Sequence, residues 1–363
     1  MAKKTPLYDE HVKLSDKVVD YAGWFLPVEY KGLVKEHEAV REKVGMFDVS
    51  HMGEITIKGK DAEKYVDYLC TNDIKTLENG KIIYTFFCYE DGTVVDDLLV
   101  YKKSSEDLYL VVNASNTDKD YDWIVKNKGS FDVEIINESD DTGEVAVQGP
   151  LAQKTLQKLT DTNLDEVTFF TFKENVKIAG VNAMISRTGY TGEDGFEVYT
   201  HKDDIVKVWN EVLKAGEEFG IEPAGLGCRD TLRFEASLPL YGHEISDKVN
   251  PIDGGFKYFV KLDKESDFIG KEALKKYVDS GVKKKLIGLE LKGRGIPREG
   301  YRVEKDGKDI GYITTGYMSP TLKKPIANVL VDVDAAIGDK VSVIIRNKPV
   351  EAELISKKFL QKK

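Results

Sequence analysis

The sequence predicts an α+β fold that ends in a separate all-β domain. Across the first 280 residues, stretches with helical spacing and stretches with strand alternation are mixed, without the strict strand–helix–strand order of a doubly wound sheet. Beyond residue 283, six short strands follow one another and are separated by Gly, Asp, Asn or Pro. The length of 363 residues exceeds what one hydrophobic core usually supports, so we expect two or three domains.

The region before the all-β domain is expected to form two interleaved α+β domains, made of residues 1–50 with 140–225 and of residues 51–139 with 226–280. Helical spacing predicts helices at 33–44, 61–70, 118–125, 151–159, 203–219 and 269–278, and Gly45 is expected to stop the first of them. Alternation predicts strands at 52–58, 94–101, 108–113 and 145–148, with further strands around Ala183 and Glu197.

The C-terminal domain is expected to span residues 281–363 and to follow a basic, Gly-containing connector. Its strands are predicted at 285–291, 301–304, 310–314, 326–331, 340–345 and 350–355. Strands of this length, divided by turn residues, are typical of a small β-barrel or sandwich.

Composition and charge exclude several classes of function. With 41% hydrophobic residues, 32% charged residues and no apolar run of membrane-spanning length, the chain is expected neither to cross nor to enter a bilayer. The net charge of −10 argues against nucleic acid as a general partner, because phosphate binding needs a dense basic surface. The N-terminus lacks the apolar core of a secretory signal, and the 3 cysteines are widely spaced, so we expect reduced thiols and a cytoplasmic location.

Several motifs for cofactors and nucleophiles are missing. The 5 histidines never form the close pairs of zinc sites and no Cys-x-x-Cys occurs, so no metal is expected. The run from Gly225 to Asp230 begins like a dinucleotide-binding fingerprint, but Asp230 stands in place of its last glycine. Neither a Walker A loop nor a Gly-x-Ser-x-Gly nucleophile elbow is found.

The stretch from Ser186 to Glu197 is the most informative part of the sequence. Three glycines surround one aromatic residue and three carboxylates, between two apolar runs that read as strands. Glycine permits a positive φ and a close approach of the backbone to another group. The stretch is either a β-hairpin with charged turn residues or a turn whose polar groups converge on a ligand.

A pair of carboxylates, Asp96 and Asp97, lies inside the apolar strand at 94–101. Adjacent strand residues point to opposite faces, so one of the two is expected to face inward. A buried carboxylate is either a strand-end group that bonds loop amides or a candidate acid or base with a raised pKa. Tyr101 lies four residues after Asp97, so the two side chains are expected on the same face of the strand. Tyr84 and Asn113 are expected to line the same side of the site.

Arg229 stands beside Asp230 at the head of a predicted helix. The pair is either a surface ion pair of little energetic value or the mark of a fixed planar cation behind a glycine turn. In the second case the guanidinium is suited to an oxyanion or a heterocycle carbonyl.

Taken together, these motifs resemble the aminomethyltransferase, or T-protein, family of the glycine cleavage system. The resemblance spans nearly the whole chain in the family's motif order and rests on residues 22–24, 47–53, 96–101, 147–150, 186–197, 224–230 and 319–321. It implies a three-domain cloverleaf around a central folate pocket. The implied reaction transfers the one-carbon unit from an aminomethyl group on the lipoyl arm of the H-protein to tetrahydrofolate, which gives methylenetetrahydrofolate and ammonia.

The resemblance also implies roles for individual residues. Glu197 would accept two N–H groups of the pterin edge, and Arg229 would balance that carboxylate and meet the pterin carbonyl. Asp97 would be the catalytic residue, which orients the attacking folate nitrogen or stabilises positive charge as ammonia leaves. Further side chains assigned to the folate pocket are Tyr84, Tyr101 and Tyr190, as flat faces for rings, together with Asn113 and Met52. Asp97, Glu197 and Arg229 are expected to line one cavity.

In this interpretation the turn glycines bring the backbone close to a pterin, and Glu193 and Asp194 are solvated turn residues. The tail after residue 357 has neither the Pro nor the Tyr of many relatives, so no C-terminal substrate contact is assigned. The lysines at 283–285, 323, 324 and the C-terminus form either a docking surface for an acidic lipoyl carrier or a solvated face.

Two alternatives use the same scaffold. One is a folate-dependent demethylase, although many of those relatives are fused to a flavin-dependent region for which this chain has no length. The other is a folate-binding protein of iron–sulfur cluster assembly, whose cysteine motif is replaced here by the Cys-free segment from Ala236 to Glu244.

Overall fold

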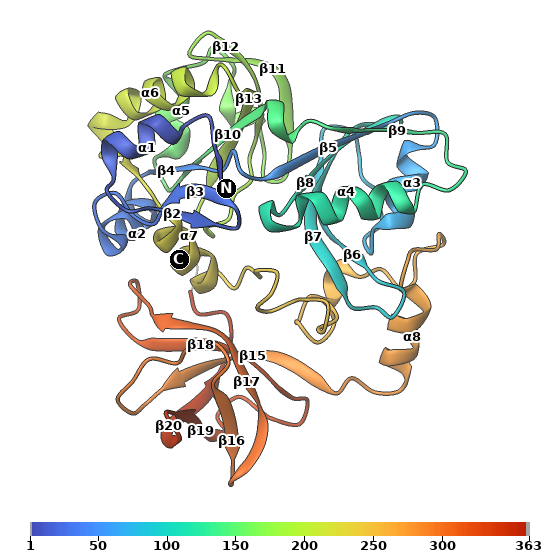
Figure 1. Ribbon diagram of the computed structural model, residues 1–363, viewed down its shortest axis with the longest axis vertical. Coiled ribbons are helices and arrows are strands. Elements are labelled where there is room, and N and C mark those ends of the chain that lie inside the picture. Colours follow the sequence, from blue (N-terminus) through green and yellow to red (C-terminus); the bar gives the residue numbers. More distant parts are fainter. Residues whose placement is uncertain (1, 361–363) are drawn as a thin grey trace. The chain divides into compact units, whose positions relative to one another are not determined.

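The computed structural model describes residues 2–360, and the chain divides into two compact units. Unit 1 runs up to Val66 and adds Ile74–Tyr84 and Leu98–Leu232, while unit 2 consists of Asp67–Asp73, Thr85–Asp97 and the chain from Arg233 onward. Figure 1 labels the helices and strands of both units. Asp97 is therefore the last residue of a unit 2 segment, whereas Glu197 and Arg229 belong to unit 1.

A six-stranded sheet forms one half of unit 1, in the order β11-β12-β13-β10-β4-β14. Its strands are β4 (Gly45–Asp48), β10 (Thr142–Gln148), β11 (Phe172–Ile178), β12 (Val181–Ser186), β13 (Gly195–His201) and β14 (Glu222–Pro223). Helices α5 (Ala152–Gln157) and α6 (Ile205–Gly216) contact β13 and β10. They cover the face on which Val145, Val147 and Val198 enter an apolar core around Trp209.

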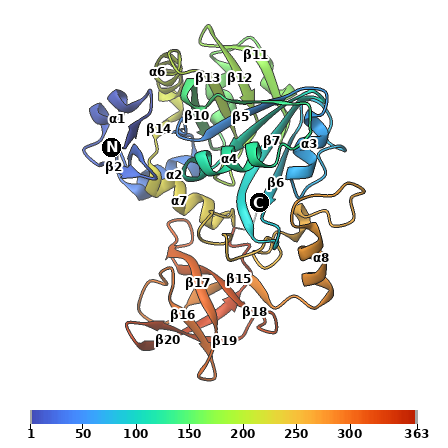
Figure 2. The same cartoon turned by 45° about the vertical axis from the view of Figure 1, so that its right-hand side comes forward.

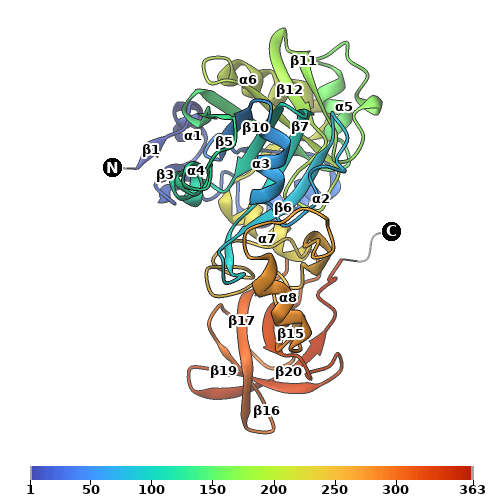
Figure 3. The same ribbon diagram turned by 90° about the vertical axis from the view of Figure 1, so that its right-hand side faces the viewer.

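The second large sheet has the order β6-β7-β8-β5-β9. Its strands are β5 (Gly53–Lys58), β6 (Ile82–Cys88), β7 (Val94–Ser104), β8 (Asp107–Val112) and β9 (Glu134–Asn137). Helix α4 (Thr117–Lys126) packs against β5, and Tyr65 of α3 (Ala62–Leu69) donates a hydrogen bond to the carbonyl oxygen of Ile124 in α4. Figure 3 shows α3 in front of this sheet.

The two sheets meet within unit 1 through side chains of both. Tyr101 and Tyr109 of the five-stranded sheet share a buried cluster with Phe172 and Tyr199 of the six-stranded sheet. Figure 2 shows β5 and β7 next to β10 and β13. Residues that face this interface alternate with residues that face the helices, as the period of two in a strand requires.

The N-terminal part of unit 1 adds a small three-stranded sheet, β1 (Lys3–Lys4), β2 (Val18–Tyr21) and β3 (Trp24–Pro27), in the order β1-β3-β2. Helix α1 is Tyr8–Leu14, α2 is Leu33–Glu42 and α7 is Leu226–Glu235. Asp48, at the end of β4, attaches this N-terminal part to the six-stranded sheet. Its carboxylate accepts hydrogen bonds from Thr5 Oγ1 and His11 Nε2, both at 2.7 Å.

Unit 2 contains a closed barrel with the strand order β15-β18-β17-β16-β19-β20. Its strands are β15 (Lys284–Leu291), β16 (Arg302–Lys305), β17 (Lys308–Met318), β18 (Pro325–Asp332), β19 (Lys340–Ile345) and β20 (Lys348–Ile355), and helix α8 (Lys271–Asp279) precedes them. Its core consists of aliphatic side chains such as Leu289, Val329 and Leu354. The predicted mixture of helices and strands followed by a C-terminal barrel is confirmed.

Two local predictions differ from the structure. Helix α2 ends at Glu42, and Gly45 is the first residue of β4 instead of a helix stop. A side chain at Gly45 would lie 2.3 Å from Val40 Cγ2, so close packing of strand on helix accounts for this glycine.

Among residues 2–360, no helix is long and apolar enough to span a membrane, and no group of three metal-binding side chains is found.

Candidate functional site

Three of the predicted site residues meet in unit 1 around the guanidinium of Arg229. Its carbon Cζ lies 4.8 Å from the centre of the Tyr190 ring, and Nη2 lies 3.9 Å from Met52 Sδ. All three side chains are partly exposed. A cation stacked on one face of an aromatic ring is held in a fixed plane, so Arg229 presents its remaining N–H groups in a defined direction.

Glu197 belongs to the same group. It lies in β13, remains partly exposed, and accepts a hydrogen bond from Thr188 Oγ1. Burial raises the pKa of Glu197, whereas the hydrogen bond from Thr188 and the charge of Arg229 lower it and so limit the rise. The carboxylate of Glu197 and the guanidinium of Arg229 are thus electrostatically linked.

The polar face of helix α2 holds α7, the helix that carries Arg229. Glu36 Oε2 accepts a hydrogen bond from Gly225 N at 2.9 Å, just before α7 begins. His37 Nδ1 lies 2.8 Å from Thr231 Oγ1, and Arg41 Nη2 donates to the carbonyl oxygen of Leu232 at 3.1 Å. These three charged or polar residues were not predicted, because a single sequence does not reveal that the polar side of a helix is buried.

Arg41 also fixes the turn that carries Tyr190. Its Nη1 donates to the carbonyl oxygen of Thr191 at 2.6 Å and to Glu193 Oε1 at 2.8 Å. Asp194 is exposed, as predicted for a solvated turn residue, and Glu193 is partly exposed. Asp194 also pairs with Arg187, at 2.6 Å and 2.8 Å, so both carboxylates have arginine partners that the sequence did not predict.

The stretch from Ser186 to Glu197 is a hairpin connection, because Ser186 of β12 pairs with Glu197 of β13. Two of its glycines serve the protein's own packing. Side chains at Gly189 and Gly195 would lie 2.0 Å and 2.5 Å from atoms of the Gln148 side chain. These two glycines allow the backbone to approach Gln148, whose side-chain N–H donates to the carbonyl oxygen of Thr188 at 3.0 Å, and their approach to a pterin stays a prediction.

Tyr101 differs from its predicted role as an open aromatic face. Its side chain is fully buried and its ring lies 5.3 Å from that of Phe172 and 5.9 Å from that of Tyr199. Its hydroxyl group lies 3.2 Å from Ser186 Oγ and 2.8 Å from Tyr199 Oη. Other rings pack around that of Tyr101, so its hydroxyl group contacts Ser186 and Tyr199 inside the protein.

Several buried titratable residues near Glu197 were not predicted from the sequence. Glu144 in β10 and Glu54 in β5 are 1% and 0% exposed, and burial raises the pKa of both well above the ordinary value. Burial, with the charge of Arg229, lowers the pKa of His51 to about 3. Strand alternation was the available signal, since Glu144 lies opposite Tyr199 and two residues before Ala146, which lies opposite Glu197.

The remaining predicted residues lie in or directly after strands of the five-stranded sheet. Asp97 in unit 2 is 9% exposed, and its neighbour Asp96 is fully buried. Both faces of this strand are thus covered, although alternation required only one of the pair to face inward. Tyr84 in β6 and Asn113, which follows β8, are partly exposed residues of unit 1. That Asp97 shares a cavity with Glu197 and Arg229 stays a prediction.

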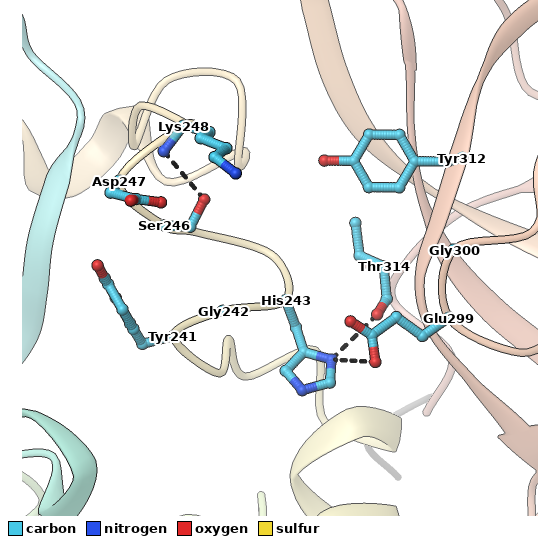
Figure 4. Close-up of a pocket in the computed structure, with 10 residues that line it drawn as sticks. All are labelled: Tyr241, Gly242, His243, Ser246, Asp247, Lys248, Glu299, Gly300, Tyr312 and Thr314. Atoms are coloured by element: carbon cyan, nitrogen blue, oxygen red, sulfur yellow. Dashed lines mark hydrogen bonds and ion pairs between the residues drawn. The ribbon is translucent and has the colours of Figure 1, made fainter.

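A separate cavity lies within unit 2 (Figure 4), with a volume of about 360 Å³. It is lined by Tyr241, Gly242, His243, Ser246, Asp247, Lys248, Glu299, Gly300, Tyr312 and Thr314. His243 Nδ1 lies 3.1 Å from the carbonyl oxygen of Thr314 and 3.6 Å from Glu299 Oε2. The cavity combines aromatic, cationic and anionic groups in one open space.

Beside this cavity, the segment from Ala236 to Glu244 has a structural role. The Glu244 carboxylate accepts Arg233 Nη1 at 2.8 Å, the hydroxyl groups of Thr314 and Thr315 at 2.8 Å and 2.6 Å, and Leu240 N at 3.1 Å. Glu244 thus ties this segment to Arg233 and to the barrel strand that carries Thr314 and Thr315.

Comparisons with known proteins agree with this fold. Residues 7–264 match the model of the GCVT N-terminal domain, and residues 284–361 match the glycine cleavage T-protein C-terminal barrel domain. The chain is similar to an aminomethyltransferase of Alkaliphilus oremlandii, with 56% identity over 98% of this chain and 97% of the relative. It is 54% identical to one from a Thermoanaerobacter species, over 99% of this chain and 98% of the relative.

A solved structure is similar throughout. The aminomethyltransferase T of the glycine cleavage system from Bartonella henselae aligns with a TM-score of 0.92 and 29% identity, over 99% of this chain and 98% of that one. The fold and site therefore define a folate-dependent transferase of the aminomethyltransferase class. The chain belongs to the glycine cleavage T-protein family.

Proposed function

We propose that this chain transfers the one-carbon unit of an aminomethyl-lipoyl group, carried by an H-protein, to tetrahydrofolate. The carbon–sulfur bond and the carbon–nitrogen bond of the aminomethyl group break, and bonds from that carbon to N5 and N10 of the folate form. The two protons lost by the folate nitrogens go to the departing ammonia and to the lipoyl sulfur. The products are methylenetetrahydrofolate, ammonia and the reduced lipoyl thiol.

The arrangement of Glu197, Arg229 and Tyr190 is the observation that carries this proposal. The pterin edge offers adjacent N–H donors, for which Glu197 is a bidentate acceptor. Arg229, held against Tyr190 at 4.8 Å, supplies a donor for the pterin carbonyl and limits the rise in the pKa of Glu197. Partly exposed Tyr84, Asn113 and Met52 complete the proposed set of folate contacts.

Asp97 is the proposed catalytic residue. A carboxylate near the folate nitrogens orients the attacking nitrogen and stabilises positive charge while an iminium forms and ammonia leaves. A folate nitrogen is already nucleophilic, so placement of the two reactants supplies much of the rate. Neither a metal nor a covalent enzyme intermediate is needed for the bonds that form and break.

The proposed partners and location follow from the reaction. The lipoyl arm must belong to a carrier protein that docks and leaves, and a basic surface favours encounter with an acidic carrier. Lys324 is exposed and pairs with Glu290 at 3.2 Å, so it is one candidate contact. All three cysteines are buried thiols, which supports a reducing, cytoplasmic location.

The test is tetrahydrofolate-dependent release of ammonia from an aminomethylated lipoyl carrier, with wild type compared with Asp97→Asn. We expect wild type to turn over and the variant to lose about a hundredfold or more in kcat, with tetrahydrofolate binding retained. Glu299→Gln, an exposed residue of the unit 2 cavity, is the control. Undiminished turnover by Asp97→Asn removes Asp97 from catalysis. Wild type that binds folate without turnover contradicts the proposed reaction.

A further inference from the structure

Gln148, at the end of β10, lies against the hairpin connection between β12 and β13 that carries Tyr190. Its side chain is fully buried, and its amide group bonds the connection at two points. Nε2 donates to the carbonyl oxygen of Thr188 at 3.0 Å, and Oε1 accepts the hydroxyl group of Thr191 at 2.7 Å. One amide group therefore holds the chain on both sides of the tyrosine that stacks on Arg229.

These two contacts require an amide group. The carbonyl oxygen of Thr188 only accepts hydrogen bonds, so the NH₂ group of Gln148 must face it. The Thr191 hydroxyl group accepts from Glu193 N at 3.2 Å and donates its own proton to Gln148 Oε1. A carboxylate of the same shape could accept from Thr191 but could not donate to Thr188. A methionine of similar length has no donor and only a weak acceptor.

Gly189 and Gly195 leave the space that this amide group occupies. A Cβ atom at Gly189 would lie 2.0 Å from Gln148 Oε1, and one at Gly195 would lie 2.5 Å from Nε2. Neither glycine has a positive φ, whereas Gly192 in the same connection does. The need for glycine at these two positions is therefore steric, because a side chain there would displace the amide group.

Two residues of the connection link Gln148 to the charged groups of the site. Thr188, whose carbonyl oxygen accepts the amide N–H, donates its hydroxyl group to Glu197 Oε2. Tyr190, two residues further along, has its ring 4.8 Å from Arg229 Cζ. Gln148 thus acts on the carboxylate and on the guanidinium through its neighbours in the connection.

We propose that Gln148 is a positioning residue for the folate site. Its amide group sets the plane in which Tyr190 stacks on Arg229 and the orientation of the Glu197 carboxylate. A ligand with adjacent N–H donors and a carbonyl group then meets the carboxylate and the guanidinium in one fixed geometry. The part of this inference that concerns the ligand rests on the proposed function, whereas the placement of Tyr190 by Gln148 does not.

The placement of Tyr190 is tested without folate by fluorine NMR of the full chain labelled with fluorotyrosine, in which Tyr190→Phe identifies the signal. We expect Gln148→Met to shift or broaden this signal, because the ring is no longer held in one plane. Gln157→Met is the matched control, since Gln157 braces another loop of unit 1 by donating to the carbonyl oxygens of Thr160 and Thr162. A Tyr190 signal unchanged in Gln148→Met, or changed equally by both variants, overturns the proposal.

The effect on the site is tested by calorimetric titration of tetrahydrofolate. We expect Gln148→Met to raise Kd about tenfold and Gln157→Met to leave it within about twofold. Wild-type affinity in Gln148→Met overturns the positioning role. Wild type that binds no folate would contradict the proposed function and leave the NMR result on Tyr190 standing.

A compensating pair of substitutions separates this role from a direct contact of the glycine with the ligand. Gly189→Ala keeps Gln148 but displaces its amide group, so it should raise Kd about tenfold or more and change the Tyr190 signal. Gln148→Ala removes the amide group and makes room for the methyl group. The double variant should therefore bind no more weakly than Gln148→Ala alone. Losses that multiply in the double variant would show that Gly189 serves the ligand instead of Gln148, and they overturn the proposal.

Discussion

Glu244 in unit 2 and Glu54 in unit 1 are buried in opposite ways. Glu244 in unit 2 is surrounded by four donors, one of them the Arg233 guanidinium, and its pKa lies below the ordinary value even though burial opposes this. Glu54 in unit 1 has no partner for either oxygen, and its pKa is raised by burial and by the nearby Glu138. A carboxylate that is fully paired stabilises a fold, whereas one that is buried without partners is kept at a cost in stability.

The apolar interior of the barrel extends this contrast. Aliphatic side chains fill the barrel core, while the interface between the sheets of unit 1 contains Glu54, Glu144 and three tyrosines whose pKa values are raised, Tyr101, Tyr109 and Tyr199. Both regions follow strand alternation. Residues with perturbed pKa values cluster at functional sites, so this difference supports the proposal that the ligand site lies in unit 1.

The largest expected effect on stability comes from breaking the pair in unit 2. Glu244→Ala leaves the Arg233 charge buried and should lower the free energy of unfolding by about 3–5 kcal/mol at pH 7. The pKa of Glu244 is depressed in the fold, so its contribution is present above the unfolded pKa and is lost as the pH falls through the folded value. Urea denaturation at several pH values measures this. A loss below about 1 kcal/mol at pH 7 would mean that the pair is not structural.

Removing the charge of Glu54 should have the opposite sign. The pKa of Glu54 is raised in the fold, so its contribution to stability is full below the unfolded pKa and is lost as the pH rises toward the folded value. Glu54→Gln should therefore increase the free energy of unfolding by about 1–3 kcal/mol at pH 8, and the gain should vanish near pH 4. Denaturation curves of Glu54→Gln and wild type at the two pH values measure this difference in the free energy of unfolding. A variant less stable than wild type at pH 8 would show that Glu54, like Glu244, stabilises the fold.

A smaller effect is expected from the support of the site. Arg41→Ala releases both the Tyr190 turn and the end of α7, and we expect kcat/KM to fall about tenfold. Arg41→Lys keeps the positive charge, but a lysine lacks the planar guanidinium that bonds both the Tyr190 turn and the end of α7. It should therefore recover only part of the lost kcat/KM. Arg302→Ala, an exposed arginine of the barrel, is the control and should match wild type. Unchanged kinetics in Arg41→Ala would show that α2 does not position the site.

The barrel was predictable because each of its strands is short, alternating and bounded by turn residues, so local signals sufficed. Glu197, Tyr190 and Arg229 were predicted from Gly-containing motifs, and the structure places Tyr190 against Arg229. Arg41 and Glu144 were not, because their partners lie 150 and 55 residues further along the chain, at Thr191 and Tyr199, and local periodicity contains no information on such contacts. The division of residues 1–280 into two interleaved domains stays a prediction.

The central claim is that Glu197 and Arg229 form the folate site, and calorimetric titration of tetrahydrofolate tests it most directly. For Glu197→Gln we expect Kd to rise about a hundredfold or more, because two charge-assisted hydrogen bonds are lost. Glu193→Gln lies on the same turn but pairs with Arg41 instead, so it should bind within about threefold of wild type. Wild-type affinity in Glu197→Gln would contradict the account.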